Sequence, residues 1–258
     1  MSKPEIQLFH SPDAFYDHAA QRFVRAAKQA IQQRGVFTCA LAGGNTPLEL
    51  YRQLASPHYR NQVPWRKVHF FWGDERCVPP DHPESNYFNA YKSFIEPLSI
   101  PSSHVHRIKG ELLPDLAIQD YARLLQKFAS KEAGAPPWPV FDLVILGLGE
   151  DGHIASIFPG SEETNSPIIS VSAQYQGRPA HRISLTPLVF NHARQIFFLV
   201  RGKNKHDAFV QSLSGRQDLL RWPAQRIRPI QGSVTWIVDC EAAGDAINQI
   251  ILNKQRVL

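Results

Sequence analysis

Short apolar runs of strand length alternate along the chain with stretches in which apolar residues recur at helical spacing. A strand is predicted over residues 6–9, followed by a helix that begins at Ser11 and Pro12 and ends at Gly35. Serine is a favoured helix N-cap, proline fits the first turn, and glycine accepts the left-handed conformation that follows a helix. Such alternation predicts an α/β, Rossmann-like fold with a mainly parallel sheet and helices on both faces.

The same pattern extends to the end of the chain. Further strands are predicted over residues 36–42, 68–72, 140–147, 182–185, 195–200 and 234–238. Helices are predicted over residues 47–54, 86–95, 115–128, 207–213 and 242–253. No repeat is visible and the proline-rich stretch 134–139 is too short to mark a boundary, so we expect residues 1–258 to form a single domain.

The carboxyl ends of the predicted strands are where chemistry is expected. In open parallel sheets, ligands bind in the crevice beyond these ends. The loops after Ala42, Trp72, Leu146 and Val200 should therefore gather around one site.

Composition narrows the class of protein. The 258 residues include 28 Lys+Arg and 23 Asp+Glu, which gives a net charge of +5. The longest strongly apolar runs, 143–149 and 196–200, are far shorter than the roughly 20 residues of a membrane span. Positive charge is spread along the chain without a nucleic-acid-binding motif, so we expect no membrane or nucleic-acid partner. A modest positive excess suits a site for a small anion.

Cysteine usage points to a reducing compartment. Cys39, Cys77 and Cys240 are scattered and form no CxxC pair. The first residues show no secretion signal, so we expect a cytoplasmic protein with free thiols.

Residues Gly43, Gly44, Asn45 and Thr46 join a predicted strand to a predicted helix. Glycines let an oxyanion approach the backbone, and a helix N-terminus attracts negative charge. One interpretation is a phosphate-binding loop; the other is an ordinary turn with Thr46 as the helix N-cap. The spacing and lysine of a Walker loop are absent.

Asp74, Glu75 and Arg76 follow almost directly on an apolar strand, in a segment predicted to be a polar loop. At the carboxyl end of a strand they could contact substrate, and Arg76 could bind an anion with two hydrogen bonds. A solvated turn with a local ion pair is the alternative.

A third segment matches the GxGxxG pattern at Gly147, Gly149 and Gly152. A dinucleotide site would also need a long helix and an acidic residue about 20 positions further on. Pro159 ends any helix early and no acid lies near Ser172, so the pattern does not indicate a dinucleotide site.

What remains in this segment is a histidine on a glycine-rich loop. His153 lies beside Asp151, and imidazole is the usual general base near neutral pH. A neighbouring carboxylate can fix its tautomer. We therefore interpret His153 as catalytic.

Two later strands carry cations at their ends, Arg182 and Lys205. Each alone could be an exposed surface residue. Together with the glycine loop they favour a phosphorylated small molecule as ligand. No GxSxG serine motif or HExxH metal motif is present, and we expect no metal and no cofactor.

These segments together resemble the 6-phosphogluconolactonase family, which is related in fold to the glucosamine-6-phosphate deaminases. The matching stretches are AGGNTPLELYRQL at 42–54, DERCVP…HPESNY within 68–87, FDLVILGLGEDGHIASIFPG at 141–160 and RISLTP…FFLVRGKNK at 182–205, with a weaker match at 222–224 and 236–243. Asn45 stands where the family more often has serine. The deaminase loops differ: Arg76 replaces a tyrosine, and the segment after His153 lacks a glutamate.

The resemblance implies hydrolysis of 6-phosphoglucono-δ-lactone to 6-phosphogluconate in the oxidative pentose phosphate pathway. It implies His153 as the base that activates water, with Asp151 orienting it. The substrate would be bound by Gly43, Gly44, Asn45, Thr46, Asp74, Arg76, Arg182 and Lys205. Whether Arg76 contacts the phosphate or the carbonyl is left open.

Two alternatives to hydrolysis stay open. A sugar-phosphate isomerase or deaminase on the same fold would use Asp74 as a base on carbon. A non-catalytic sugar-phosphate-binding regulator would keep the glycine loop without needing His153. The sequence leaves the oligomeric state open, with a monomer favoured.

Overall fold

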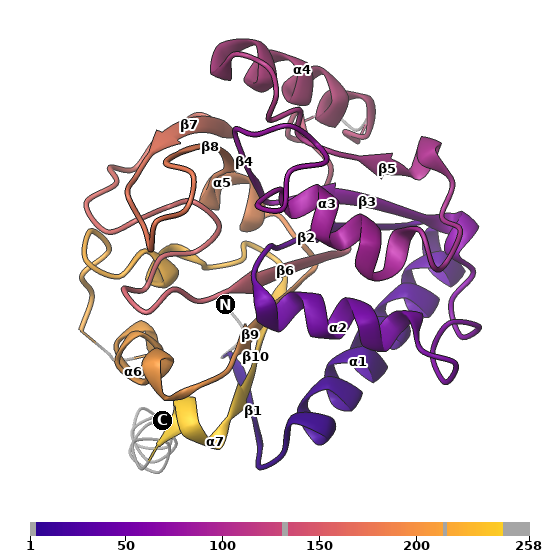
Figure 1. The fold of residues 1–258 in the computed structure, drawn as a ribbon, viewed down its shortest axis with the longest axis horizontal. Coiled ribbons are helices and arrows are strands. Elements are labelled where there is room, and N and C mark those ends of the chain that lie inside the picture. Colours follow the sequence, from indigo (N-terminus) through magenta and orange to yellow (C-terminus); the bar gives the residue numbers. More distant parts are fainter. Residues whose placement is uncertain (1–3, 131–133, 214–215, 245–258) are drawn as a thin grey trace.

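The computed structural model describes residues 4–130, 134–213 and 216–244. Its centre is a seven-stranded sheet in which every pair of neighbours is parallel. In spatial order the strands are β1 (Glu5–Phe9), β10 (Ser233–Asp239), β9 (Gln195–Val200), β6 (Leu143–Gly147), β2 (Phe37–Leu41), β3 (Val68–Trp72) and β5 (Val105–His106). The predicted parallel sheet is confirmed, and Figure 1 shows it running through the middle of the molecule.

The longer helices also lie where the pattern placed them. They are α1 (Pro12–Arg34), α2 (Asn45–Ala55), α3 (Asn86–Ala90) continued by a π-helical turn (Tyr91–Ile95), α4 (Pro114–Lys127) and α6 (His206–Leu213). Short helices are α5 (Pro187–Phe190) and α7 (Cys240–Ala243). The predicted closing helix 242–253 begins within α7, which ends at Ala243, and residues 245–253 lie outside the described residues.

Alternating side chains show that helices cover both faces of the sheet. Phe70 of β3 packs against Phe94 of the π-helical turn, whereas Phe71, next along the strand, packs against Phe128 at the end of α4. In β10, Thr235 bonds to Arg22 of α1, and the following Trp236 packs on Phe209 of α6. Because successive strand residues point to opposite faces, α1 and the π-helical turn lie on one face and α4 and α6 on the other.

A second, antiparallel sheet was not predicted. It consists of β4 (Asp74–Arg76), β8 (His181–Leu185) and β7 (Ile168–Ser172), in that order. The prediction of a polar loop at 74–76 is wrong, since these residues form a buried strand. They pair with β8, which satisfies their backbone groups away from solvent.

The connections place a crevice between β2 and β6. From β2 the chain crosses to β3 on one side, and from β6 it crosses to β9 on the other. The pairing of β2 with β6 covers two residue pairs, Cys39 with Leu143 and Ala40 with Val144, before the strands separate. Such a switch point is where open α/β sheets bind ligands.

None of the helices in the described part of the chain is long and apolar enough to cross a bilayer.

The helix α1 ends at a glycine in the left-handed conformation. Gly35 follows the helix with φ 78° and donates its N–H to the Ile31 carbonyl. A Cβ there meets no atom within 4 Å, so Gly35→Ala should cost only the left-handed strain, about 1 kcal/mol of unfolding free energy. Urea unfolding would measure this loss. Gln32→Ala on the exposed side of the same helix should change stability by less than about 0.5 kcal/mol, and a loss equal to that of Gly35→Ala would contradict the argument.

Candidate active site

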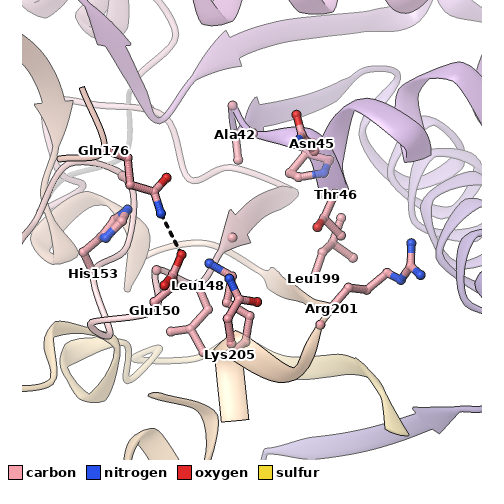
Figure 2. Close-up of a pocket in the computed structure, with 18 of the residues that line it drawn as sticks. Ala42, Asn45, Thr46, Leu148, Glu150, His153, Gln176, Leu199, Arg201 and Lys205 are labelled. Carbon is pink, nitrogen blue, oxygen red and sulfur yellow. Dashed lines mark hydrogen bonds between the residues drawn. The ribbon is translucent and has the colours of Figure 1, made fainter. Parts of the chain in front are cut away.

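A cleft of about 620 Å³ opens at the carboxyl ends of the parallel strands (Figure 2). The loops after β2, β6 and β9 line it, as the strand pattern predicted. The predicted site residues that line the cleft are Gly43, Gly44, Asn45, Thr46, Asp74, Arg76, His153, Arg182 and Lys205. Asp151 is not part of the lining but contacts His153.

The glycine loop ends at the N-terminus of α2. The helix begins at Asn45, with Gly44 as the N-cap at φ 93°. Thr46 therefore lies in the first helical turn, and the interpretation of Thr46 as the N-cap is wrong. Since none of the described side chains caps this helix, its first N–H groups and its dipole are available to an anion in the cleft.

Two side chains fix the position of this loop. The Tyr51 hydroxyl donates to the Ala42 carbonyl at 2.8 Å and accepts from the Ala42 N–H at 3.0 Å. Gly43 packs so closely on Asn86 that a Cβ at Gly43 would overlap the amide. The loop is thus held from α2 on one side and from α3 on the other.

The three charged side chains of β4 are buried and alternate in direction along the strand. Asp74 and Arg76 point into the cleft, whereas Glu75, between them, points to the opposite face. Asp74 accepts hydrogen bonds from Ser156 Oγ at 2.6 Å and from Asn86 Nδ2 at 3.2 Å. Both of its carboxylate oxygens are therefore engaged with the protein.

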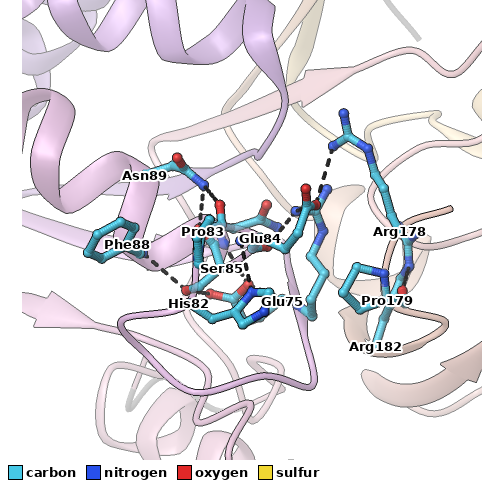
Figure 3. Close-up of polar contacts among 12 residues, drawn as sticks. Glu75, His82, Pro83, Glu84, Ser85, Phe88, Asn89, Arg178, Pro179 and Arg182 are labelled. Carbon is cyan, nitrogen blue, oxygen red and sulfur yellow. Dashed lines mark hydrogen bonds and ion pairs between the residues drawn. The ribbon is translucent and has the colours of Figure 1, made fainter. Parts of the chain in front are cut away.

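Glu75 joins β4 to the start of α3 (Figure 3). Glu75 is 2% exposed, and its carboxylate accepts four hydrogen bonds, from the N–H groups of Arg76, Asn86 and Tyr87 and from the Ser85 hydroxyl. Burial raises the pKa of Glu75 to about 7, and the four donors oppose that rise. The alternative of a solvated turn is therefore wrong for this segment.

Arg76 and Arg182 lie directly opposite each other in the β4–β8 pair. Like charges in such a position repel. Arg76 donates to the Glu84 carbonyl at 2.6 Å, and Arg182 lies over the ring of Phe158. Among the described residues, Arg76 Nε and Arg182 Nη2 are buried without a hydrogen-bond partner. Two unpartnered guanidinium N–H groups at a cleft favour binding of an anion.

His153 is fixed by its own loop. Asp151 Oδ1 lies 2.7 Å from His153 Nδ1 and accepts the His153 backbone N–H at 3.1 Å. Burial raises the pKa of Asp151, but hydrogen bonds from His153 more than offset it and hold the pKa below its usual value. An ionised Asp151 only accepts, so Nδ1 is the nitrogen that carries the proton in the neutral imidazole, in which Nε2 has the lone pair.

A later segment supports this loop. Gly152 has φ 85°, and a Cβ there would lie 2.6 Å from the Trp222 ring. The Ala224 N–H donates to the Gly152 carbonyl at 3.1 Å. The 222–224 match noted in the sequence thus packs behind the histidine.

Lys205 reaches the cleft from the loop after β9. In this loop the Gly202 N–H donates to both oxygens of Asp239, at the end of β10. Burial lowers the pKa of Lys205, while the nearby carboxylates of Glu150 and Asp151 oppose that effect.

Several cleft residues were not predicted, namely Tyr16, Asn86, Glu150, Tyr175, Gln176, Arg178 and Arg201. Arg201 directly follows β9, so its position at a strand end could have identified it. The residues at 175–178 lie between β7 and β8 and carry no motif.

Within the described residues, no group of three or more His, Cys, Asp or Glu side chains is arranged to hold a metal ion.

A helix N-terminus, buried cations and a carboxylate-bound histidine in one cleft define an enzyme site for a small anionic substrate. Residues 10–236 match the family model described as glucosamine-6-phosphate isomerases/6-phosphogluconolactonase. The chain belongs to this family. It is 37% identical over 246 residues to a 6-phosphogluconolactonase of Nostoc, covering 94% of this chain and 98% of the relative.

Solved structures agree with this assignment. The 6-phosphogluconolactonase of Trypanosoma brucei superposes with a TM-score of 0.82 at 28% identity, covering 96% of this chain and 99% of that one. A monomeric glucosamine-6-phosphate deaminase matches with a TM-score of 0.79 at 21% identity, covering 93% and 98%. The latter likeness concerns the fold alone and confirms the predicted deaminase-like architecture.

Titration of Glu75 should make stability depend on pH. The pKa of Glu75 is about 7 in the native state and ordinarily 4.5, so the folded protein binds this proton more tightly than the unfolded chain. The free energy of unfolding should therefore fall as the pH rises from about 4.5 to 7, by about 3 kcal/mol from this group.

Glu75→Gln removes the titrating group, so its stability should decline less over this range. Urea unfolding of both proteins at pH 5, 6, 7 and 8 compares the two curves. Asp81→Asn, at an exposed carboxylate in the segment that follows β4, is the control and should follow the wild type. Parallel curves for the wild type and Glu75→Gln would refute the assignment.

Proposed function

We propose that the chain is a 6-phosphogluconolactonase, which hydrolyses 6-phospho-D-glucono-1,5-lactone to 6-phospho-D-gluconate. Its curated relatives carry that name over nearly their whole length. The observation that carries the proposal is His153, held by Asp151 in a cleft that also contains the N-terminus of α2 and buried cations. A phosphorylated lactone, anionic at its phosphate and uncharged at the ester that reacts, is the substrate such a cleft suits.

His153 acts as general base in this proposal. With Nδ1 bonded to Asp151, Nε2 takes a proton from water as the oxygen attacks the lactone carbonyl. The resulting oxyanion collapses, the bond between the carbonyl carbon and the ring oxygen breaks, and the imidazolium returns its proton to that oxygen. Asp151 stabilises the imidazolium and holds the tautomer, so no covalent intermediate is required.

The phosphate binds at Gly43, Gly44, Asn45, Thr46 and Lys205. Support comes from the uncapped first turn of α2 and from Lys205 in the same cleft. Fixing the phosphate positions the carbonyl against the water, which lowers the entropic part of the barrier. Arg76 and Arg182, with unpartnered N–H groups, add positive charge for the developing oxyanion.

The isomerase or deaminase alternative depends on Asp74 as a base. Its two oxygens already accept from Ser156 and Asn86, which disfavours proton abstraction from carbon. Release of ammonia from glucosamine 6-phosphate would support the alternative. A non-catalytic regulator would show no turnover of the lactone.

The domain organisation, oligomeric state and cellular location of the protein are also part of the proposal. We infer a single domain acting as a cytoplasmic monomer without a nucleic-acid partner. All three cysteines fall in the described part of the chain and are unpaired, which suits a reducing compartment. Size-exclusion chromatography with light scattering tests the oligomeric state.

Removal of the base should abolish most of the catalysis. His153→Ala is expected to lower kcat by about 10²–10⁴-fold, the usual contribution of a general base. Opening of freshly generated 6-phosphogluconolactone, corrected for spontaneous hydrolysis, gives the rates. The variant should still bind 6-phosphogluconate, and full activity in it would exclude His153 as the base.

Loss of the lysine charge should weaken recognition of the phosphate. Lys205→Met keeps the chain length, and loss of a charged hydrogen bond of about 1.5–3 kcal/mol predicts a roughly 10- to 100-fold rise in KM. The unphosphorylated glucono-1,5-lactone is the control substrate, and its kcat/KM should be equal in the wild type and the variant. Equal losses for both lactones would show that Lys205 does not recognise the phosphate.

A further inference from the structure

The hairpin between β7 and β8 lines the cleft beside the histidine. Tyr175 and Arg178 pair across its tip, and the Arg178 N–H donates to the Tyr175 carbonyl at 3.0 Å. Tyr175, Gln176 and Arg178 all line the cleft. The hairpin thus brings side chains from outside the parallel sheet to the site.

Gln176 has a backbone conformation that its side chain does not favour. Its φ is 51°, and that of Gly177 is 67°. Turns with positive φ at both central residues are typically built from asparagine, aspartate or glycine, so a glutamine at the first position is strained. Strained residues of this kind cluster at functional sites, where their side chains have a role that offsets the strain.

The Gln176 side chain reaches the loop that carries the histidine. Its Nε2 donates to Glu150 Oε1 at 2.6 Å, a bond drawn beside His153 in Figure 2. Glu150 directly precedes Asp151, the carboxylate bonded to His153. The hydrogen bond therefore joins the tip of the hairpin to the histidine loop.

The neighbouring Tyr175 packs on the imidazole itself. Its ring meets that of His153 edge to face, with centroids 4.7 Å apart and planes at 79°. On another side Phe158 contacts the same imidazole at 4.6 Å. Displacement of Tyr175 would remove one of the two rings that confine His153.

We infer that Gln176 and Tyr175 are positioning residues for His153, with the Gln176–Glu150 hydrogen bond holding the Tyr175 ring against the imidazole. Neither is required to touch the reacting atoms. The inference rests on the proposed function, in which His153 is the base. It explains why a strained glutamine occupies the turn, since glycine would relax the backbone but lose the bond.

The variant Gln176→Gly distinguishes an effect on the position of His153 from an effect on the stability of the fold. It should lower kcat for lactone hydrolysis about tenfold, leave KM within twofold, and keep the unfolding midpoint at or above that of the wild type. Gln174→Gly, at an exposed position in the same hairpin, is the matched control and should keep the wild-type kcat. An unchanged kcat, a raised KM at constant kcat, or parallel losses of kcat and stability would each overturn the inference.

A double variant tests whether Gln176 acts through Tyr175. Tyr175→Ala should lower kcat at least as much as Gln176→Gly, and the double variant should be no slower than Tyr175→Ala alone. Multiplicative losses would refute the shared route. Turnover by the wild type and Gln174→Gly is measured in parallel, so failure of the proposed lactonase activity itself would be seen there.

Discussion

The buried carboxylate of Glu75 is the contact on which the site depends most. It accepts hydrogen bonds from its own strand and from residues 85–87, and so binds the start of α3 to β4. That placement brings Asn86 against both Asp74 and the glycine loop. A single group on the far side of β4 thereby fixes the walls of the cleft, although it does not line the cleft itself.

The geometry of the parallel sheet determines where the other loops of the cleft lie. Strands β9, β6, β2 and β3 are neighbours and end at one edge, so three glycine-containing loops meet there. Separation of β2 from β6 after two residue pairs opens the crevice. Phosphate recognition and base catalysis can then be supplied by different loops, because each loop starts from a rigid strand end.

Most of the fold could be predicted from the sequence, because α1, β3 and β9 have clear apolar periodicity and end at strong cap or turn residues. The place of the glycine loop, His153 and Lys205 in the cleft could be predicted because each lies in a loop that follows a strand of the parallel sheet. The burial of residues 74–76 could not be predicted, because three adjacent charges are typical of an exposed loop. The residues that bind these charges lie elsewhere in the chain. The contacts of Tyr175 and Gln176 depend on how a hairpin folds over the sheet, which local pattern does not encode.

The packing of Trp222 behind Gly152 has a consequence for biosynthesis. Every predicted site residue lies before position 206, yet the loop that presents His153 is supported by residues 222–224, and Asp239 anchors the loop that carries Lys205. A nascent chain that has emerged only as far as Lys205 would hold all of the chemical groups without their supports. Activity on the ribosome should therefore appear late, when the strand β10 has joined the sheet.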